Sequence, residues 1–159
     1  CSSDLKYYKH LKTQMIIEVN DDEKVSAVNA AASLNKLLQV SGGAVYTDAR
    51  NVLEFDISPR LNALQEVLDE TYNKVIVFVP YRHTIEVVHR YLVGNGISAE
   101  VIQGDVSLSE RTRLISNFQQ LTDPRVLVIQ PQAASHGVTL TAADTIVFWS
   151  PVKIGRAHV

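Results

Sequence analysis

Apolar and polar positions along the chain divide it near residue 58 into two differently patterned parts. In residues 6–45, apolar side chains recur at helical spacing, which predicts two helices separated by the polar stretch NDDE (20–23). The prediction of these helices is based on the apolar residues Leu11, Met15, Val19, Val28, Ala31, Leu34 and Leu38. The following AVYTDARNVLEFD (44–56) predicts a short hairpin around residues 48–50. We therefore expect residues 6–57 to form a helical lead-in and a hairpin.

Strands and helices alternate from Ser58 onward. Ser58 is a candidate N-cap and Pro59 suits the first helical position, followed by a leucine stripe at 61, 64 and 68. Apolar strands are predicted at 75–79, 97–102, 126–130 and 145–149, each a candidate for burial in a sheet. Helices are predicted at 83–93 and after the capping box that Ser107 forms with Glu110, with Leu114, Ile115, Phe118 and Leu121 facing inward. Strands separated by helices predict an α/β fold with a parallel sheet.

The loops that follow these strands are the candidate functional segments, because ligands of parallel sheets bind at the carboxyl ends of the strands. They are PYRH (80–83), QGDVS (103–107), QPQAASHG (130–137) and SPV (150–152). Two amides at Gln130 and Gln132 both donate and accept hydrogen bonds. Arg82, together with Arg111 and Arg113 at the start of a helix, offers a corner suited to phosphate. A tight crossover loop and solvated charges are the plainer interpretation of the same residues.

Composition narrows the classes of protein. The chain has 159 residues, 46% hydrophobic and 20% charged, which suits one globular domain. A net charge of −2 argues against a bulk basic nucleic-acid binder, though not against a local basic groove. The apolar runs are too short to cross a membrane, and Cys1 is the single cysteine, so we expect a reducing cytoplasm and no membrane partner. The histidines lack metal-ligand spacing, and no GxxxxGK[ST] motif is present to hold a triphosphate.

Three segments in order resemble motifs IV, IVa and V of the C-terminal domain of superfamily 2 helicases. They are KVIVFVPYRHTIEVVHRYL, GISAEVIQGDVSLSERTRLISNFQ and PRVLVIQPQAASHGVTLTAADTIVFWSP. The sequence is most similar to the Swi/Snf-type translocases of phage and prophage flavour, and the resemblance covers residues 6–152. It implies a RecA-like α/β domain, the second of two such domains that bind ATP between them and move along nucleic acid. Residues 58–152 would be this domain, with its C-terminal part missing.

The resemblance also implies roles for particular residues. The residues expected to face the nucleic-acid backbone are Pro80, Tyr81, Arg82, Gly104, Asp105, Arg111, Gln130, Pro131 and Gln132. Gly137 and Thr139 would approach the nucleotide. Ala134-Ser135 stands where many members have Gly-Gly, and Thr139 replaces a frequent Asn, so individual contacts in this loop depart from the family pattern.

The function implied is that of an ATP-dependent helicase or translocase acting on double-stranded DNA in a bacterial or phage-infected cell. ATP and Mg²⁺ would be held mainly by the missing first domain, so this chain alone is expected to be inactive and to contain no catalytic residue or metal ligand of its own. The residues themselves leave two alternatives open. One is a non-catalytic RecA-like or flavodoxin-like module that binds a nucleotide or a protein, and the other is the acceptor half of a nucleotide-sugar transferase.

Both ends of the chain are expected to be read-through of a sequencing adapter. KIGRAHV (153–159) back-translates to DNA containing AGATCGGAAGAGCACACGTC, a common library adapter, and CSSDL (1–5) back-translates to its reverse complement. The Gly155-Arg156 pair resembles the beginning of an arginine-finger motif, but it comes too soon after Val152 and lacks that motif's glutamine and second arginine. We therefore expect residues 1–5 and 153–159 to lie outside the natural protein.

Overall fold

The computed structural model describes residues 5–6, 9, 16–20, 23–26, 30–134 and 140–151, and for residues 16–30 it describes the backbone alone. The chain forms two compact units. One unit is Asp56–Trp149, and the other comprises Ser2–Phe55 together with Ser150–Val159.

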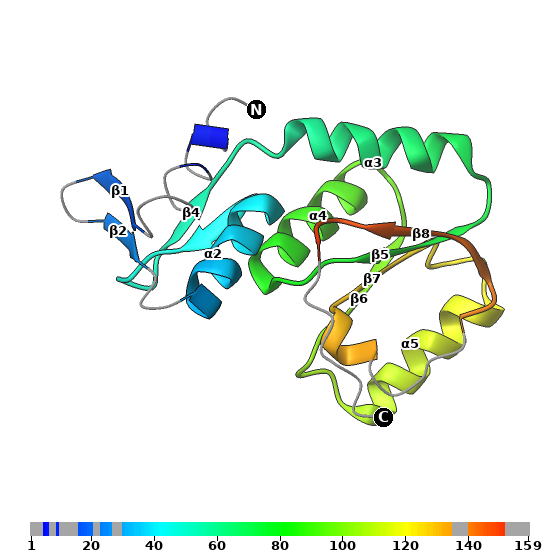
Figure 1. Cartoon of the computed structure of the whole chain (residues 1–159). Coiled ribbons are helices and arrows are strands. Elements are labelled where there is room, and N and C mark those ends of the chain that lie inside the picture. The colour runs from blue at the N-terminus through cyan, green and yellow to red at the C-terminus, as the bar shows by residue number, and fades with distance from the viewer. Residues whose placement is uncertain are drawn as a thin grey trace. The chain divides into compact units, whose positions relative to one another are not determined.

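The Asp56–Trp149 unit is built on a four-stranded parallel sheet with the strand order β6-β7-β5-β8 (Figure 1). Its strands are β5 (Lys74–Phe78), β6 (Ala99–Ile102), β7 (Val126–Ile129) and β8 (Ala143–Phe148). All three strand pairings are parallel, with β5 flanked by β7 and β8. The predicted parallel α/β sheet is therefore confirmed.

Helices cover both faces of this sheet. The helices α3 (Ser58–Glu70) and α4 (Arg82–Gly94) pack on one face, where they share an apolar core with β5 and β7. On the opposite face, α5 (Leu108–Gln120) packs with Leu114 and Phe118 against alternate residues of β5, β6 and β7 (Figure 1). All four residues of β7 are buried, as expected for a strand sandwiched between helices. The apolar strand runs of the sequence are thus explained by burial on both faces.

Two helix starts show how well the sequence predicts capping. At α5, the Ser107 hydroxyl accepts a hydrogen bond from the Glu110 N–H at 3.3 Å, which confirms half of the predicted capping box. At α3, Ser58 is not the N-cap: the cap is Ile57, and the Asp56 carboxylate accepts from the Ser58 N–H at 3.0 Å. The prediction was wrong by one residue because the helix begins at Ser58 itself, whose N–H is already satisfied by the Asp56 carboxylate.

Three apolar residues predicted to be buried are exposed. The strand β8 is an edge of the described sheet, and its residues alternate between partly buried and exposed, with Ile146 and Phe148 exposed by 55% and 62%. Leu121, predicted to lie on the inward face of α5, is 54% exposed and follows the helix. The prediction of a fully buried fourth strand was therefore wrong, because α5 covers β5, β6 and β7 but not the outer face of β8.

The described part of the other unit includes two antiparallel strand pairs and the helix α2. The strands β1 (Ile16–Asn20) and β2 (Glu23–Ser26) pair with each other, and α2 (Ala30–Gly42) leads into the hairpin of β3 (Ala44–Tyr46) and β4 (Val52–Glu54). The predicted hairpin around residues 48–50 is confirmed. The predicted helix across residues 16–19 is wrong, because the β-branched run Ile-Ile-Glu-Val favours extended backbone over a helix.

The buried face of α2 also differs from the predicted stripe. Val40 is buried with Val45 and Phe55 of the hairpin, and Leu37 packs against this cluster, while Leu34 is 48% exposed. The hairpin follows α2 directly through Gly43, whose φ of 105° only glycine adopts readily. The turn brings the hairpin against the Leu37 and Val40 side of the helix, so that side rather than the Leu34 side is buried.

Candidate nucleic-acid interface

The loops after β5, β6 and β7 lie together at the carboxyl edge of the sheet. The central strand of these three is β7, which is hydrogen-bonded to β5 on one side and to β6 on the other. Gln130, directly after β7, donates its backbone N–H to the Ile102 carbonyl at 2.8 Å, and Val79 after β5 donates to the Ile129 carbonyl at 3.0 Å. The ladder therefore continues to the last residue of each strand and sets the three loops side by side.

The Gln130 side chain bridges the two outer loops. Its Oε1 accepts a hydrogen bond from the Gly104 N–H at 3.0 Å, and its Nε2 donates to the Pro80 carbonyl at 3.4 Å. A glutamine amide is suited to this position because it carries one acceptor and two donors. A Cβ at position 104 would lie 3.6 Å from the same Oε1, an ordinary contact, so glycine is not sterically required there. The structure thus directs the Gln130 amide to neighbouring loops.

An ion pair joins the same two loops at the surface. Arg82, the first residue of α4, places its Nη1 3.1 Å from the Asp105 Oδ2. The two side chains are 52% and 54% exposed, so solvent and ligands reach both. No pattern in the sequence predicts this pairing, since the two residues are separated by a helix and a strand.

The remaining arginines of the predicted phosphate corner have local partners. Arg111 donates from Nη2 to the Val106 carbonyl at 3.4 Å, so its guanidinium lies against the loop after β6. Arg113 donates from Nη2 to Glu110 at 2.5 Å, one turn earlier on α5, and this bond holds the pKa of the Glu110 carboxyl below its ordinary value. Arg113 thus contributes little net charge to the edge, whereas Arg111 supports the loop that carries Asp105.

The other predicted contact residues occupy different environments. Pro80 is buried, and Tyr81 is half-buried at the N-cap of α4, where burial raises the pKa of its phenol above the ordinary value of 10.0. Pro131 begins a short 3₁₀ helix, Pro131–Ala134, in which Gln132 is exposed. The predicted nucleotide contacts Gly137 and Thr139 lie outside the described residues, as does Val152 of the loop at 150–152.

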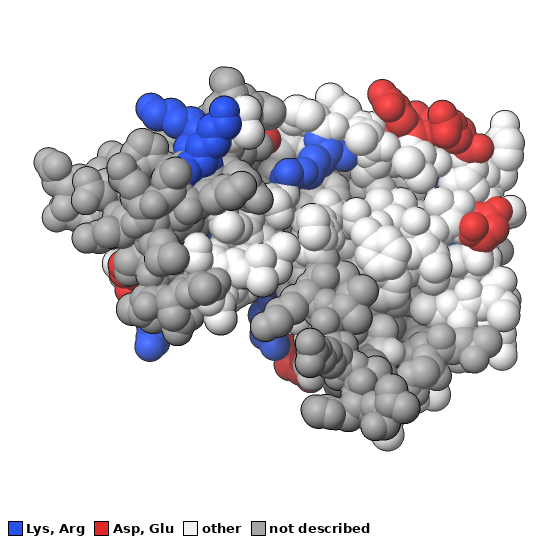
Figure 2. Space-filling model, viewed as in Figure 1, with Lys and Arg blue, Asp and Glu red and all other residues white. Residues whose placement is uncertain are grey.

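Positive charge is local on the coloured part of the face that Figure 2 shows. On the face in Figure 2, Lys and Arg side chains are scattered among white and red areas, and they form no continuous basic band over the part that is coloured. The described residues contain no group of three His, Cys, Asp or Glu side chains placed to hold a metal ion, so they do not fit a Mg²⁺ site. No helix in the described part is long and apolar enough to cross a membrane.

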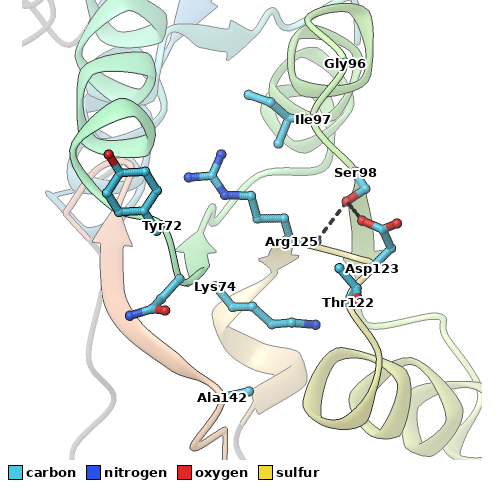
Figure 3. Close-up of a pocket in the computed structure, with 10 residues that line it drawn as sticks. Tyr72, Lys74, Gly96, Ile97, Ser98, Thr122, Asp123, Arg125 and Ala142 are labelled. Carbon is cyan, nitrogen blue, oxygen red and sulfur yellow. Dashed lines mark hydrogen bonds between the residues drawn. The ribbon is translucent and has the colours of Figure 1, made fainter.

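A hollow of about 520 Å³ lies at the opposite, amino edge of the sheet (Figure 3). Its two cations are already occupied by backbone carbonyls. Lys74 Nζ donates to the Leu121 and Pro124 carbonyls at 2.5 and 2.9 Å, and Arg125 donates to the Leu68 carbonyl at 2.6 Å. Lys74 and Arg125 therefore hold the ends of neighbouring elements together around this hollow, which no pattern in the sequence predicts.

A parallel sheet covered by helices on both faces, with arginine and amide side chains on the loops at its carboxyl edge, defines an α/β domain with a candidate ligand site at that edge. Comparison with known families identifies it further. Residues 59–156 match the helicase conserved C-terminal domain. This match covers more than half of the chain, and the protein belongs to that family.

Relatives and solved structures agree with this assignment. The human DNA annealing helicase and endonuclease ZRANB3 is 35% identical over 89 residues, and the uncharacterized ATP-dependent helicase MG018 of Mycoplasma genitalium is 24% identical over 145. These matches cover 54% and 89% of the chain. The C-terminal domain of the Sulfolobus solfataricus SWI2/SNF2 ATPase superposes with a TM-score of 0.65 at 18% identity, covering 93% of this chain and 67% of that one. The core of the same ATPase in complex with dsDNA gives a TM-score of 0.58 at 16% identity, covering 93% of this chain and 31% of that one.

The chain is short beside its relatives. The matched segment is 8% of ZRANB3 and 14% of MG018. At these identities, the structural likeness to the archaeal ATPase establishes the fold. The likeness does not by itself establish the activity of the whole protein.

Proposed function

We propose that this chain is the second motor domain of an ATP-dependent helicase or translocase that acts on double-stranded DNA. The observation that carries the proposal is the grouping of Arg82, Asp105 and Gln130 at the carboxyl edge of a helicase C-terminal domain. Support for duplex DNA comes from the archaeal ATPase core of the same fold, which was solved in complex with dsDNA.

In this proposal the carboxyl-edge loops grip the DNA backbone. Arg82, at the start of α4, presents a planar fork of donors to a phosphate, and such contacts position the protein without reading sequence. Tyr81 and Gln132 flank Arg82 and Gln130, and both can donate to phosphate oxygens. Few cations take part, so the affinity depends on a small number of phosphate contacts.

A nucleotide would be held mainly outside this chain. The sequence has no GxxxxGK[ST] motif, and the described residues do not fit a Mg²⁺ site. We propose that ATP and Mg²⁺ sit on a first RecA-like domain in the same polypeptide, that Gly137 and Thr139 approach the nucleotide from this side, and that the protein works in the cytoplasm. When bound, ATP supplies the free energy of movement by losing its γ-phosphate.

The proposal is tested in the full-length protein by measuring ATP hydrolysis against the concentration of duplex DNA. We expect hydrolysis to rise with DNA, and Arg82→Ala to increase the DNA concentration for half-maximal rate about tenfold, the size of one hydrogen bond to a charged group. Arg90→Ala is the matched control, because Arg90 is exposed on α4 about 12 Å further along the same helix. Hydrolysis that no nucleic acid stimulates would contradict the proposal.

The dependence of DNA affinity on salt concentration provides a second test of the proposed function. Each phosphate contact contributes a slope of about −0.9 to the logarithm of affinity against the logarithm of salt concentration. Arg82→Ala should therefore make this slope shallower by about 0.9, whereas Arg90→Ala should leave it unchanged.

A further inference from the structure

Asp105 is an unusual residue for a surface that is to bind phosphate, because its carboxylate carries the same sign of charge as the ligand. It lies in the loop after β6 and forms an ion pair with Arg82 at 3.1 Å. Both side chains are about half exposed, so the pair lies on the surface itself and not in the core beneath it. The following inference rests on the proposed function of this edge.

The loops that carry the pair are held at a fixed spacing. Arg82 and Asp105 come from loops after β5 and β6, which are not neighbours in the sheet because β7 lies between them. Gln130, at the end of β7, bonds to Pro80 on one side and to Gly104 on the other. These bonded residues lie two positions before Arg82 and one position before Asp105, so the amide bridge sets the distance that the ion pair spans.

Arg111 holds the loop that carries Asp105 through two hydrogen bonds. Its Nη2 donates to the Val106 carbonyl, and its backbone N–H donates to the Ser107 carbonyl at 2.9 Å, so residues 104–107 are tied to both β7 and α5. Asp105 also has a short side chain with few rotamers. The loop therefore presents its carboxylate toward Arg82 with little conformational freedom.

Carboxylate and phosphate compete for the same donors on arginine. The guanidinium group binds either anion through its planar fork of N–H groups, so an arginine engaged by Asp105 must change partner before it can grip a backbone phosphate. We propose that Asp105 is a built-in competitor for Arg82, which occupies the guanidinium when no DNA is bound and lowers the affinity of this edge for the DNA backbone. Exposed ion pairs are weak, so the exchange costs a few-fold in affinity and remains fast.

Such a competitor suits a protein that must release DNA as often as it binds it. Each phosphate contact lengthens the residence time on DNA, and a carboxylate poised to recapture the arginine shortens it. Asp105 is thus assigned as a residue that sets the strength and lifetime of the grip, acting through Arg82.

The test uses the full-length protein and a fluorescein-labelled duplex of 20 base pairs, with anisotropy as the measure of binding. The variants are Asp105→Asn, Arg82→Ala and the double variant, with Asp105→Ser as a second replacement should the amide form new bonds. Glu100→Gln is the matched control, since Glu100 is an exposed carboxylate on β6 away from the carboxyl edge. Thermal unfolding of each variant verifies that the fold is retained.

We expect Asp105→Asn to bind the duplex about threefold to fivefold more tightly, chiefly through slower dissociation, while Glu100→Gln binds as the parent protein does. When Arg82 is already replaced by alanine, Asp105→Asn should increase the affinity for the duplex by less than about 1.5-fold, because Asp105 then has no arginine to occupy.

Other results overturn the inference in distinguishable ways. If Asp105→Asn increases the affinity equally with and without Arg82, then Asp105 merely repels phosphate. If Asp105→Asn alone binds the duplex more weakly, then the ion pair helps to build the site. In both cases the proposed function would stand if Arg82→Ala still weakens binding. If neither Arg82 nor Asp105 affects binding, then the carboxyl edge does not contact DNA and both proposals fail.

Discussion

A single amide, that of Gln130, connects three loops that are far apart in the sequence. Its position after a buried strand predicted that it would lie at the edge of the sheet, and it does. Its orientation is what the structure adds, because both ends of the amide bond to backbone groups of the neighbouring loops. Gln130 therefore positions other residues, and any contact of its own with nucleic acid stays a prediction.

Replacing this amide tests its bridging role. We expect Gln130→Ala to lower the free energy of unfolding by about 1 kcal/mol and to weaken duplex binding, since both loop contacts are lost. Gln130→Glu keeps an acceptor for the Gly104 N–H but lacks a donor for the Pro80 carbonyl, and should give an intermediate loss of stability near neutral pH. Urea unfolding of the 159-residue chain measures the first effect and anisotropy of the full-length protein the second. Gln120→Ala, at the exposed end of α5, is the control, and equal effects at both positions would contradict the bridge.

The sequence predicted which residues lie at this edge better than it predicted their partners. Arg82 and Asp105 follow apolar strands, and strand ends meet at one edge of a parallel sheet whatever the order of the strands. Pairing depends on that order, which is β6-β7-β5-β8 and does not follow the chain. The spacing of Arg82, Asp105 and Gln130 along the chain does not show that Gln130 lies between Arg82 and Asp105.

Among the elements, those with strong periodicity were predicted and those with mixed signals were not. The helices α4 and α5 and the strands β5 to β7 carry apolar positions that agree with their burial. In residues 16–20, by contrast, helical spacing competed with β-branched composition, and the backbone is extended. For β8 the residue types predicted a strand correctly. The exposure of Ile146 among the described residues is a tertiary property, which the sequence of the strand alone does not contain.

One contact between elements makes a pH-dependent prediction. Asp144 at the start of β8 accepts hydrogen bonds from Asn73 and Thr145 at 2.5 and 2.9 Å, and these bonds lower the pKa of its carboxyl below the ordinary value of 3.8. A lowered pKa in the folded state adds stability above the ordinary pKa, and this stability is lost as the pH falls through the folded-state value.

We therefore expect Asp144→Asn to be less stable than the parent at pH 7, and the difference in stability to narrow as the pH falls below the ordinary carboxyl pKa of 3.8. Urea midpoints at pH 7, 5 and 3 measure the difference. Glu86→Gln, which removes an exposed carboxylate from α4, should show no such convergence. A constant difference between Asp144→Asn and the parent at all three values would show that the charge of Asp144 is not involved.

At the scale of the whole molecule, the exposed edge of the sheet affects behaviour in solution. Ile146 and Phe148 lie on one face of β8, and Phe148 stacks on Phe78 with ring centroids 5.3 Å apart. Exposed apolar edge strands promote association between copies. We expect the 159-residue chain to self-associate at high concentration, and Ile146→Thr to reduce this while keeping a residue that favours strands.

Sedimentation velocity over a hundredfold range of concentration measures the effect. Leu108→Thr serves as the control, because Leu108 is 77% exposed on α5 and lies outside β8. A parent chain that stays monomeric throughout the range would contradict the prediction, as would equal relief from both substitutions.

The amino edge, where Arg125 and Lys74 hold backbone carbonyls, has a consequence for how the domain opens. Bonds to Leu68, Leu121 and Pro124 join the ends of α3 and α5 to the beginnings of β7 and β5, so we expect these segments to open together with the sheet. Their amide hydrogens should exchange with solvent through global unfolding, the slowest route, whereas those of residues 103–107 exchange through local opening. The loops that face a ligand can thus change shape on a much shorter timescale than the scaffold that carries them.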